Sequence, residues 1–227
     1  MTTRVLIVDD HPVVREGLAF RISSQADMEV CGEAANAAEV LKLLSAVRPH
    51  VVIVDIQLEA SDGLDLVKHI KARDESIAVL VCSAYPDKIY AGRALKAGAL
   101  GYINKQHVTS QVVDAVRRVR DGKVYLSEEM ADQVLSQAVG QTRPRGSTPT
   151  ERLSDRELEV FRLIGDGLSA HQIARRLCLS PHTIDTHRQR IKEKLQLANA
   201  VELAQAAVRW IIQGDQPYDS GPPATTE

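Results

Sequence analysis

Short apolar runs alternate with amphipathic stretches over residues 1–125 of the chain. Continuous apolar runs, typical of strands buried on both faces of a parallel sheet, occupy 4–9, 51–55, 78–83 and 100–105, and a weaker run at 29–32 indicates a peripheral strand. Helical spacing of apolar residues predicts helices at about 13–24, 36–46, 63–73, 86–97 and 108–121. Five strand–helix repeats predict a doubly wound α/β domain with a parallel five-stranded sheet.

From Leu153 onward the spacing of apolar residues is helical only, which predicts a small all-α domain. Ser154 and Ser169 are each followed three residues later by Glu or Gln, and Ser180 precedes a proline. These are helix-start signals, so we expect helices to begin near 154, 169 and 180. A fourth helix is expected at about 199–213.

These patterns divide the chain into four parts. A further helical pattern covers 127–139, and 141–150 is rich in Pro, Gly, Ser and Thr without apolar periodicity, which predicts a flexible linker. The predicted division is an α/β domain at 1–122, a connector helix and linker at 123–150, a four-helix domain at 151–213 and a disordered tail at 214–227.

The net charge of −2 is unevenly distributed along the chain. Residues 1–140 carry 16 basic and 19 acidic side chains, whereas residues 171–196 carry 6 basic and 2 acidic ones. An acidic first part and a locally basic second part suggest two different kinds of partner.

The sequence also bears on cellular location. Cys31, Cys82 and Cys178 lack metal-ligand spacing and lie in apolar stretches, so we expect small buried residues in a reducing cytoplasm. No apolar stretch approaches the ~20 residues of a membrane span, and the N-terminus shows no signal peptide. We therefore expect a cytoplasmic protein without a membrane partner.

Polar residues at the ends of four predicted strands carry the candidate chemistry of the first domain: Asp9 with Asp10, then Asp55, Ser83 and Lys105. Ligands of doubly wound sheets bind outside the carboxyl ends of the strands. Three carboxylates there repel one another, and Mg²⁺, which prefers oxygen ligands, would compensate them. A cation, a hydroxyl and a lysine beside a carboxylate suit phosphoryl transfer to that carboxylate. Because no glycine-rich phosphate cradle is present, we expect no nucleotide.

Each of these residues also has a structural explanation when it is taken alone. A single aspartate after a strand is usually a turn or helix-cap residue, a single lysine is usually solvated, and Tyr102 is explained by packing. The order of the motifs and their strand context together favour a functional site.

In the second domain, the predicted helix from residue 180 is amphipathic. Ile184, Ile191 and Leu195 share one face, and the opposite face and flanks carry Asp185, Thr186, Gln189, Arg190, Lys192, Glu193 and Lys194. An apolar back, a polar front and basic flanks suit a helix in the major groove of DNA. By spacing alone, an ordinary solvated helix face explains the pattern equally well.

The first domain resembles the receiver domain of two-component response regulators, in particular the NarL/FixJ branch. The resemblance rests on the motifs at 9–18, 55–63, 83–84 and 101–105, which occur in the family's order. It implies a flavodoxin-like fold in which Asp55 accepts phosphate from the phosphohistidine of a sensor histidine kinase. Asp10 and Asp55 would bind Mg²⁺ directly, Asp9 through water, and Gln57 through its backbone carbonyl.

The same resemblance assigns roles around the phosphoryl group. Lys105 would pair with the phosphate, Ser83 would move toward it, and Tyr102 would rotate inward. Ala84 would leave room for it. The family usually has Met-Pro where this chain has Leu58-Glu59, so we expect a less rigid, more negative loop and a changed phosphorylation rate and lifetime.

The second domain resembles the LuxR-type helix-turn-helix domain through its motifs at 153–157, 167–169, 172–174, 179–187 and 194–195. The resemblance implies that Ser180–Leu195 is a recognition helix for double-stranded DNA. Asp185, Thr186 and Gln189 would contact base edges. Thr183, Arg188 and Lys194 would contact the DNA backbone. The expected DNA-binding set also includes Arg190 and Lys192.

The last helix of such domains commonly forms a dimer, here through Val201, Ala204 and Val208. We therefore expect a homodimer on paired half-sites, at least when the protein is phosphorylated. Ala200 replaces a common arginine, and Asp185 stands where a basic residue is common, so the preferred DNA sequence is expected to differ from that of relatives.

The sequence thus predicts a DNA-binding transcriptional regulator controlled by phosphorylation, without enzymatic turnover beyond its own phosphorylation and dephosphorylation. Two alternatives stay open. One is a protein-interaction module whose helix-turn-helix does not read DNA, which Asp185 supports. The other is an Asp-based phosphohydrolase, although its usual D-x-D pair is missing here.

Overall fold

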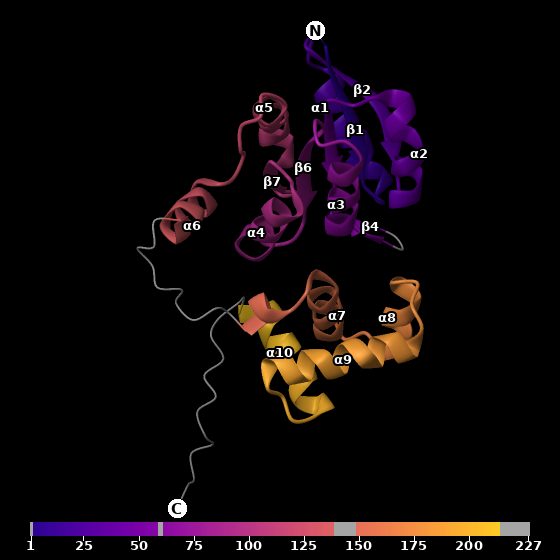
Figure 1. Ribbon diagram of the computed structural model, residues 1–227, viewed down its shortest axis with the longest axis vertical. Coiled ribbons are helices and arrows are strands. Elements are labelled where there is room, and N and C mark those ends of the chain that lie inside the picture. The colour runs from indigo at the N-terminus through magenta and orange to yellow at the C-terminus, as the bar shows by residue number, and fades with distance from the viewer. Residues whose placement is uncertain (1, 59–60, 139–148, 214–227) are drawn as a thin grey trace, which may run out of the picture. The chain divides into compact units, whose positions relative to one another are not determined.

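The computed structural model describes residues 2–58, 61–138 and 149–213 of the 227-residue chain. It separates into two compact units, Met1–Ala138 and Val139–Glu227 (Figure 1). Each has its own core. The sequence-based proposals for the tail at 214–227, for Glu59 and for most of the linker lie outside the described residues.

The first unit is built on a parallel five-stranded sheet in the order β2-β1-β3-β6-β7 (Figure 1), as predicted. Its strands are β1 Thr3–Val8, β2 Met28–Ala34, β3 Val51–Val54, β6 Ala78–Ser83 and β7 Gly101–Asn104. All residues of β3 and β6 are buried, because helices cover both faces of the sheet.

Five helices cover the two faces of the sheet. Helices α1 (Pro12–Ser23) and α5 (Val108–Arg120) pack against each other, while α3 (Gly63–Arg73) contacts both α2 (Ala37–Val47) and α4 (Asp87–Ala97). The core under α1 and α5 is aliphatic, as the low aromatic content predicts, and joins every second residue of the strands, such as Ile7 and Ile53, to Val112 and Val116.

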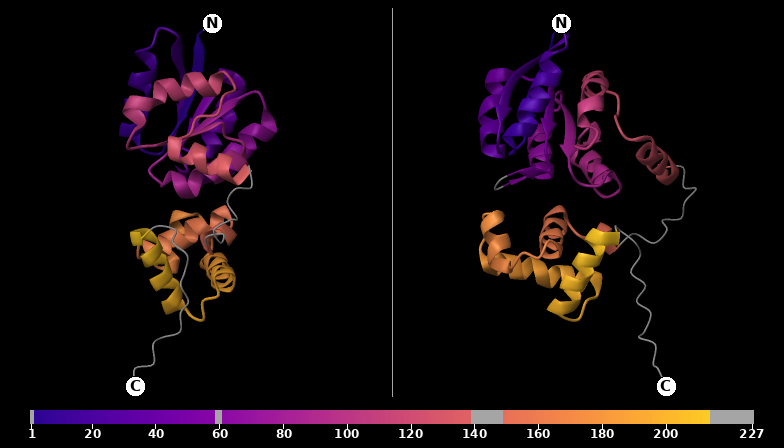
Figure 2. Two further views of the ribbon diagram at one scale, coloured as in Figure 1. Left: turned by 90° about the vertical axis from the view of Figure 1, so that its left-hand side faces the viewer. Right: turned by 180° about the vertical axis from the view of Figure 1, so that it is seen from behind.

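Two features of the first unit lie outside the regular repeat. A short antiparallel pair, β4 (Gln57–Leu58) and β5 (Ser61–Asp62), follows β3 where the sequence predicted only a loop. The predicted connector helix is present as α6 (Glu128–Ala138), which packs against α4 and buries Met130 (Figure 2). Between α5 and α6, the backbone of Tyr125 bonds to the outer edge of β7.

The second unit is helical: η1 Pro149–Arg152, α7 Asp155–Gly165, α8 Ala170–Arg176, α9 Pro181–Leu195 and α10 Ala200–Gln213. Ser154, Ser169 and Ser180 are the N-caps of α7, α8 and α9, and the first two form the predicted capping boxes. Pro149 and Thr150, assigned to the linker from the sequence, instead begin a 3₁₀ helix in which Thr150 is buried.

The expectation of three buried cysteines is confirmed for Cys82 alone. Cys82 is buried in β6 and Cys31 is half-buried, but Cys178 is exposed. Cys178 lies in the turn between α8 and α9, and its backbone has a positive φ of 51°. In the described parts of the chain, no helix combines the length and the apolar character needed to cross a bilayer.

Candidate functional site

The carboxyl ends of the parallel strands bring the predicted residues of the first unit together. Asp9 follows β1, Asp55 follows β3, and Lys105 follows β7. The Lys105 ammonium bridges the two carboxylates, with Nζ 2.6 Å from Asp9 Oδ2 and 2.7 Å from Asp55 Oδ2. Asp9, Asp55 and Lys105, which are 46 to 96 positions apart in sequence, therefore form one charged cluster. Together with Asp10 and His11 we call it the acidic cleft.

Asp55 is the electrostatically strained member of the acidic cleft. It is 2% exposed, and its Oδ1 atom has no hydrogen-bond partner among the described residues. Burial raises the pKa of Asp55 to about 6, against the opposing effect of Lys105. Burial also opposes the charge on Lys105, but the carboxylates of Asp55 and Asp9 outweigh it and raise the Lys105 pKa. The negative charge of the cleft thus exceeds its positive charge, and the Oδ1 atom of Asp55 accepts no hydrogen bond from the described residues.

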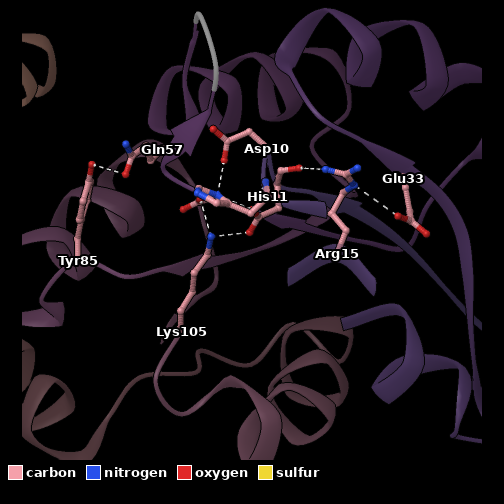
Figure 3. A network of polar contacts seen from close by, with 9 residues as sticks. Asp10, His11, Arg15, Glu33, Gln57, Tyr85 and Lys105 are labelled. Atoms are coloured by element: carbon pink, nitrogen blue, oxygen red, sulfur yellow. Dashed lines mark hydrogen bonds and ion pairs between the residues drawn. The ribbon is translucent and has the colours of Figure 1, made fainter. Parts of the chain in front are cut away.

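The acidic cleft offers the ligands that a divalent cation requires. Asp9, Asp10, His11 and Asp55 each present a ligand atom within 4.8 Å of those of the other three. Carboxylate oxygens are the usual protein ligands of Mg²⁺, and the unpartnered Asp55 oxygen is consistent with a cation there. The residues therefore fit a metal. The side chain of Gln57, the other predicted ligand residue, accepts a hydrogen bond from the Tyr85 hydroxyl at 3.2 Å (Figure 3).

Several residues that the sequence analysis did not single out hold the acidic cleft in place. Arg15 of α1 donates from Nη1 to the backbone carbonyl of Asp9 at 2.7 Å, and its Nε lies 3.5 Å from Glu33 (Figure 3). Asp62 caps α3 by accepting from Leu64 N at 2.7 Å. The helix-start pattern at Asp62 was available in the sequence, whereas the contact of Arg15 depends on the fold.

The predicted switch residues gather beside the acidic cleft. Tyr102 is 2% exposed, and its hydroxyl donates to the Tyr85 carbonyl at 2.7 Å. Burial raises the pKa of Tyr102, so this hydroxyl stays protonated and remains a donor. Ser83 is buried and accepts from Tyr85 N at 3.3 Å, while Ala84 is exposed. Tyr102 is therefore already buried in this structure, and the rotation that the resemblance implies stays a prediction.

Helices α8 and α9 form the predicted helix-turn-helix of the second unit. Ile184 and Ile191 are fully buried, and the opposite face of α9 is exposed. Arg188 lies 3.5 Å from Asp185, and Gln189 donates to Glu193 at 2.9 Å. The exposed members of the predicted DNA-binding set are Asp185, Thr186, Gln189, Arg190 and Lys194, and Thr183, Arg188 and Lys192 are half-buried.

Lys194 has a structural partner that the sequence did not reveal. Its ammonium lies 2.6 Å from Oε2 of Glu157, which is 3% exposed and also closes the capping box of α7. Burial opposes the charge of Glu157, but the bonds from Lys194 and Ser154 lower its pKa overall. Arg156 donates to the Leu177 carbonyl at 3.0 Å, so α7 is fixed both to α9 and to the turn before it.

The outer face of α10 carries an apolar stripe. Val201 is 65% exposed and Val208 is 41% exposed, and Ala204 between them is exposed as well. Ile212, 75% exposed, extends the stripe by one more turn. Helix α10 packs its other face on α7, where Gly165 permits the close approach because a Cβ there would lie 2.6 Å from the Ala207 carbonyl.

Known proteins match both units. Residues 5–117 match the family described as "Response regulator receiver domain", and residues 151–207 match "Bacterial regulatory proteins, luxR family". "Response regulator GacA" of Pseudomonas aeruginosa is 33% identical over 207 residues, covering 91% of this chain and 95% of that protein. "Transcriptional regulatory protein LiaR" of Bacillus subtilis is 34% identical over 208 residues, covering 91% and 97%.

A solved structure supports the folds of the two units. RcsB from Salmonella enterica serovar Typhimurium, bound to promoter P1flhDC in the presence of phosphomimetic BeF3-, has a TM-score of 0.66 at 24% identity. The match covers 91% of this chain and 98% of that chain. With its receiver domain and its LuxR-type helix-turn-helix domain, the chain belongs to the NarL/FixJ family of two-component response regulators and is a DNA-binding transcriptional regulator.

Proposed function

We propose that Asp55 is the phosphoacceptor of this regulator and that a sensor histidine kinase supplies the phosphoryl group. The observation that carries the proposal is the buried Asp55 Oδ1 atom, which has no hydrogen-bond partner in the described chain, in a cleft of opposed charges. A carboxylate oxygen of Asp55 attacks phosphorus and forms an acyl phosphate. The P–N bond of the phosphohistidine breaks, and the imidazole nitrogen keeps the electron pair and takes up a proton.

The residues around Asp55 would hold Mg²⁺ during this step. Asp10 and Asp55 would bind the ion directly, Asp9 through water, and Gln57 through its backbone carbonyl. When bound, the ion neutralises charge on the phosphoryl oxygens.

Lys105 would keep its ammonium in the cleft and exchange the Asp55 oxygen, now 2.7 Å away, for a phosphoryl oxygen. The Ser83 hydroxyl would donate to another phosphoryl oxygen, and Ala84 would leave space for it. Tyr102 would stabilise this arrangement from its inward position. Beyond its own phosphorylation and the hydrolysis of the acyl phosphate, we expect no enzymatic turnover.

Phosphorylation would control a homodimer that binds paired half-sites on DNA. The α10 stripe of Val201, Ala204 and Val208 is exposed and apolar, which suits a symmetric contact between two copies. Two copies of α9 would then enter successive major grooves. The arrangement of the reading residues on α9 supports direct contact with base edges and phosphates.

The test measures DNA binding with and without phosphorylation by phosphoramidate and Mg²⁺. The wild type should bind promoter DNA more tightly after treatment, whereas Asp55→Asn should not respond, and mass spectrometry should find the phosphoryl group on Asp55. Equal affinities for the two forms of the wild type would refute the switch. Contacts to DNA phosphates must weaken as salt is added. An affinity for DNA that does not respond to salt would therefore favour a module that does not read DNA.

A further inference from the structure

His11 lies between β1 and α1, and its side chain contacts the carboxylates of the acidic cleft instead of capping the helix. It is the N-cap residue of α1, a position where Ser, Thr, Asp and Asn are preferred because they bond to free backbone N–H groups. His11 makes no side-chain capping bond. Its Nδ1 instead lies 2.6 Å from Asp10 Oδ1 and 3.4 Å from Asp9 Oδ1 (Figure 3).

The carboxylate oxygens of the cleft fall into two sets. Lys105 takes the Oδ2 atoms of both Asp9 and Asp55. The Oδ1 atom of Asp9 accepts the backbone N–H of His11 at 2.9 Å and faces its imidazole. The Oδ1 atom of Asp55 has no hydrogen-bond partner among the described residues, although Asp55 is 2% exposed. A buried, unsatisfied oxygen beside other carboxylates indicates a cation, and the imidazole is one of the four groups that could hold it.

We propose that His11 is a ligand of the divalent cation in the acidic cleft and that it makes the site prefer later transition metals such as Co²⁺ and Ni²⁺ to Mg²⁺. The inference rests on the metal site of the proposed function and adds a nitrogen to its ligands. Imidazole binds first-row transition metals well, whereas Mg²⁺ prefers oxygen. Neighbouring ligands at ~2.1 Å from an octahedral metal stand ~3 Å apart. His11 Nδ1 lies 3.4 Å from Asp9 Oδ1 and, in an ion pair that the metal would replace, 2.6 Å from Asp10 Oδ1.

The alternative role of His11, a protonated partner of Asp10, has the opposite consequence. An incoming cation would have to displace an imidazolium, so removing His11 would strengthen the binding of every divalent cation. Removing a ligand weakens the binding of the nitrogen-preferring ions only. The sign of the change in Co²⁺ affinity therefore distinguishes the two roles.

Calorimetric titration of the full chain with Co²⁺ and with Mg²⁺ tests the proposal. His11→Gln should lower Co²⁺ affinity at least tenfold, since even indirect partners of metal ligands contribute about 10- to 100-fold. Its Mg²⁺ affinity should change little. His69→Gln, an exposed histidine of α3, is the matched control and should leave both affinities unchanged. Unchanged or increased Co²⁺ affinity in His11→Gln would overturn the proposal.

Pulsed electron paramagnetic resonance with Mn²⁺ provides a readout that does not depend on affinity, which matters because the chain has seven histidines. The wild type and His69→Gln should show ¹⁴N coupling from a bound imidazole, and His11→Gln should lose it. Mn²⁺ bound in the cleft without this coupling would overturn the role of His11 alone. If Asp55→Asn binds Mg²⁺ and Mn²⁺ as the wild type does, the proposed metal site fails too.

Discussion

Gly63 lies directly against the backbone of Asp55. A Cβ atom on Gly63 would stand 2.0 Å from the Asp55 carbonyl oxygen, a distance that real structures do not allow. The first residue of α3 therefore fixes the position of the loop that carries Asp55, the proposed phosphoacceptor. Gly63→Ala should displace this loop, destabilise the receiver by about 1–3 kcal/mol and slow phosphorylation of Asp55 by phosphoramidate roughly a hundredfold.

The matched control is Gly92→Ala in the interior of α4, where an added Cβ meets nothing within 4 Å. This variant should be stabilised by about 0.5–1 kcal/mol, because alanine is the better helix former, and should be phosphorylated normally. Time courses by mass spectrometry and urea unfolding measure both effects. A normal phosphorylation rate in Gly63→Ala would contradict the role assigned to this contact.

The acidic cleft should titrate in a measurable pH range. Without a divalent metal, burial raises the pKa of Asp55 to about 6 despite Lys105, so the folded protein keeps a proton that the unfolded chain releases near pH 4. The contribution of this group to stability should therefore fall as the pH rises from about 4 to 6, by roughly 3 kcal/mol.

The ¹³C chemical shift of the Asp55 carboxyl group in nuclear magnetic resonance checks this titration directly. Its midpoint should lie near pH 6, move upward in Lys105→Met, where the opposing positive charge is lost, and move downward when Mg²⁺ is added. A midpoint near pH 4 in the metal-free protein would show that the burial of Asp55 is compensated by groups other than those identified.

Two lysines on α9 should separate stability from DNA binding. Lys194→Met removes the positively charged partner of the buried Glu157 carboxylate, so the second unit should lose about 1–3 kcal/mol, and Glu157→Gln in the same chain should restore part of it. Trp210, the only tryptophan, packs against Phe161 and reports this unfolding by fluorescence.

Lys192→Met should keep the stability of the second unit and weaken DNA binding at all sequences. Its salt dependence should fall by about one unit of slope if Lys192 contacts one phosphate. Fluorescence anisotropy with labelled promoter DNA at several salt concentrations measures the slope. An unchanged slope would place Lys192 outside the DNA contact.

The apolar stripe on α10 predicts the effect of a single charge. Val208→Glu should leave the fold intact, because Val208 is 41% exposed, and should weaken dimerisation at least tenfold by burying a carboxylate at the interface. Val124→Glu, at a valine of the first unit that is 47% exposed, is the control. Sedimentation equilibrium of the phosphorylated chain gives the dimer constant, and equal constants for both variants would exclude the stripe as the contact.

The strands were predictable because each depends on a short apolar run. The main residues of the acidic cleft were predictable because the carboxyl ends of parallel strands meet at one edge of the sheet. Apolar runs that end in Asp9, Asp55, Ser83 and Lys105 must meet at one edge if the strands are parallel, and they do. The helix starts at the serine caps were predictable too, since a cap involves residues only three positions apart.

The remaining features depend on distances across the fold. The ion pair between Glu157 and Lys194 joins residues 37 positions apart. The helical spacing around either residue does not indicate that the other is its partner. The contact of Gly63 with Asp55 arises only when α3 begins beside the end of β3. Cys178 is exposed despite its apolar sequence neighbours, because neighbours in sequence do not fix the direction of a side chain.

The backbone of Tyr125 covers part of the outer edge of β7. Tyr125 N donates to the Leu100 carbonyl at 2.9 Å, and its own carbonyl accepts from Tyr102 N at 2.9 Å. Unpaired backbone N–H and C=O groups on an edge strand can pair with another chain. Here the backbone of Tyr125 pairs with two of these groups instead. A receiver truncated after residue 122, the boundary that the sequence suggests, would expose this edge of β7 to self-association. A receiver that retains Tyr125 would keep these two hydrogen bonds.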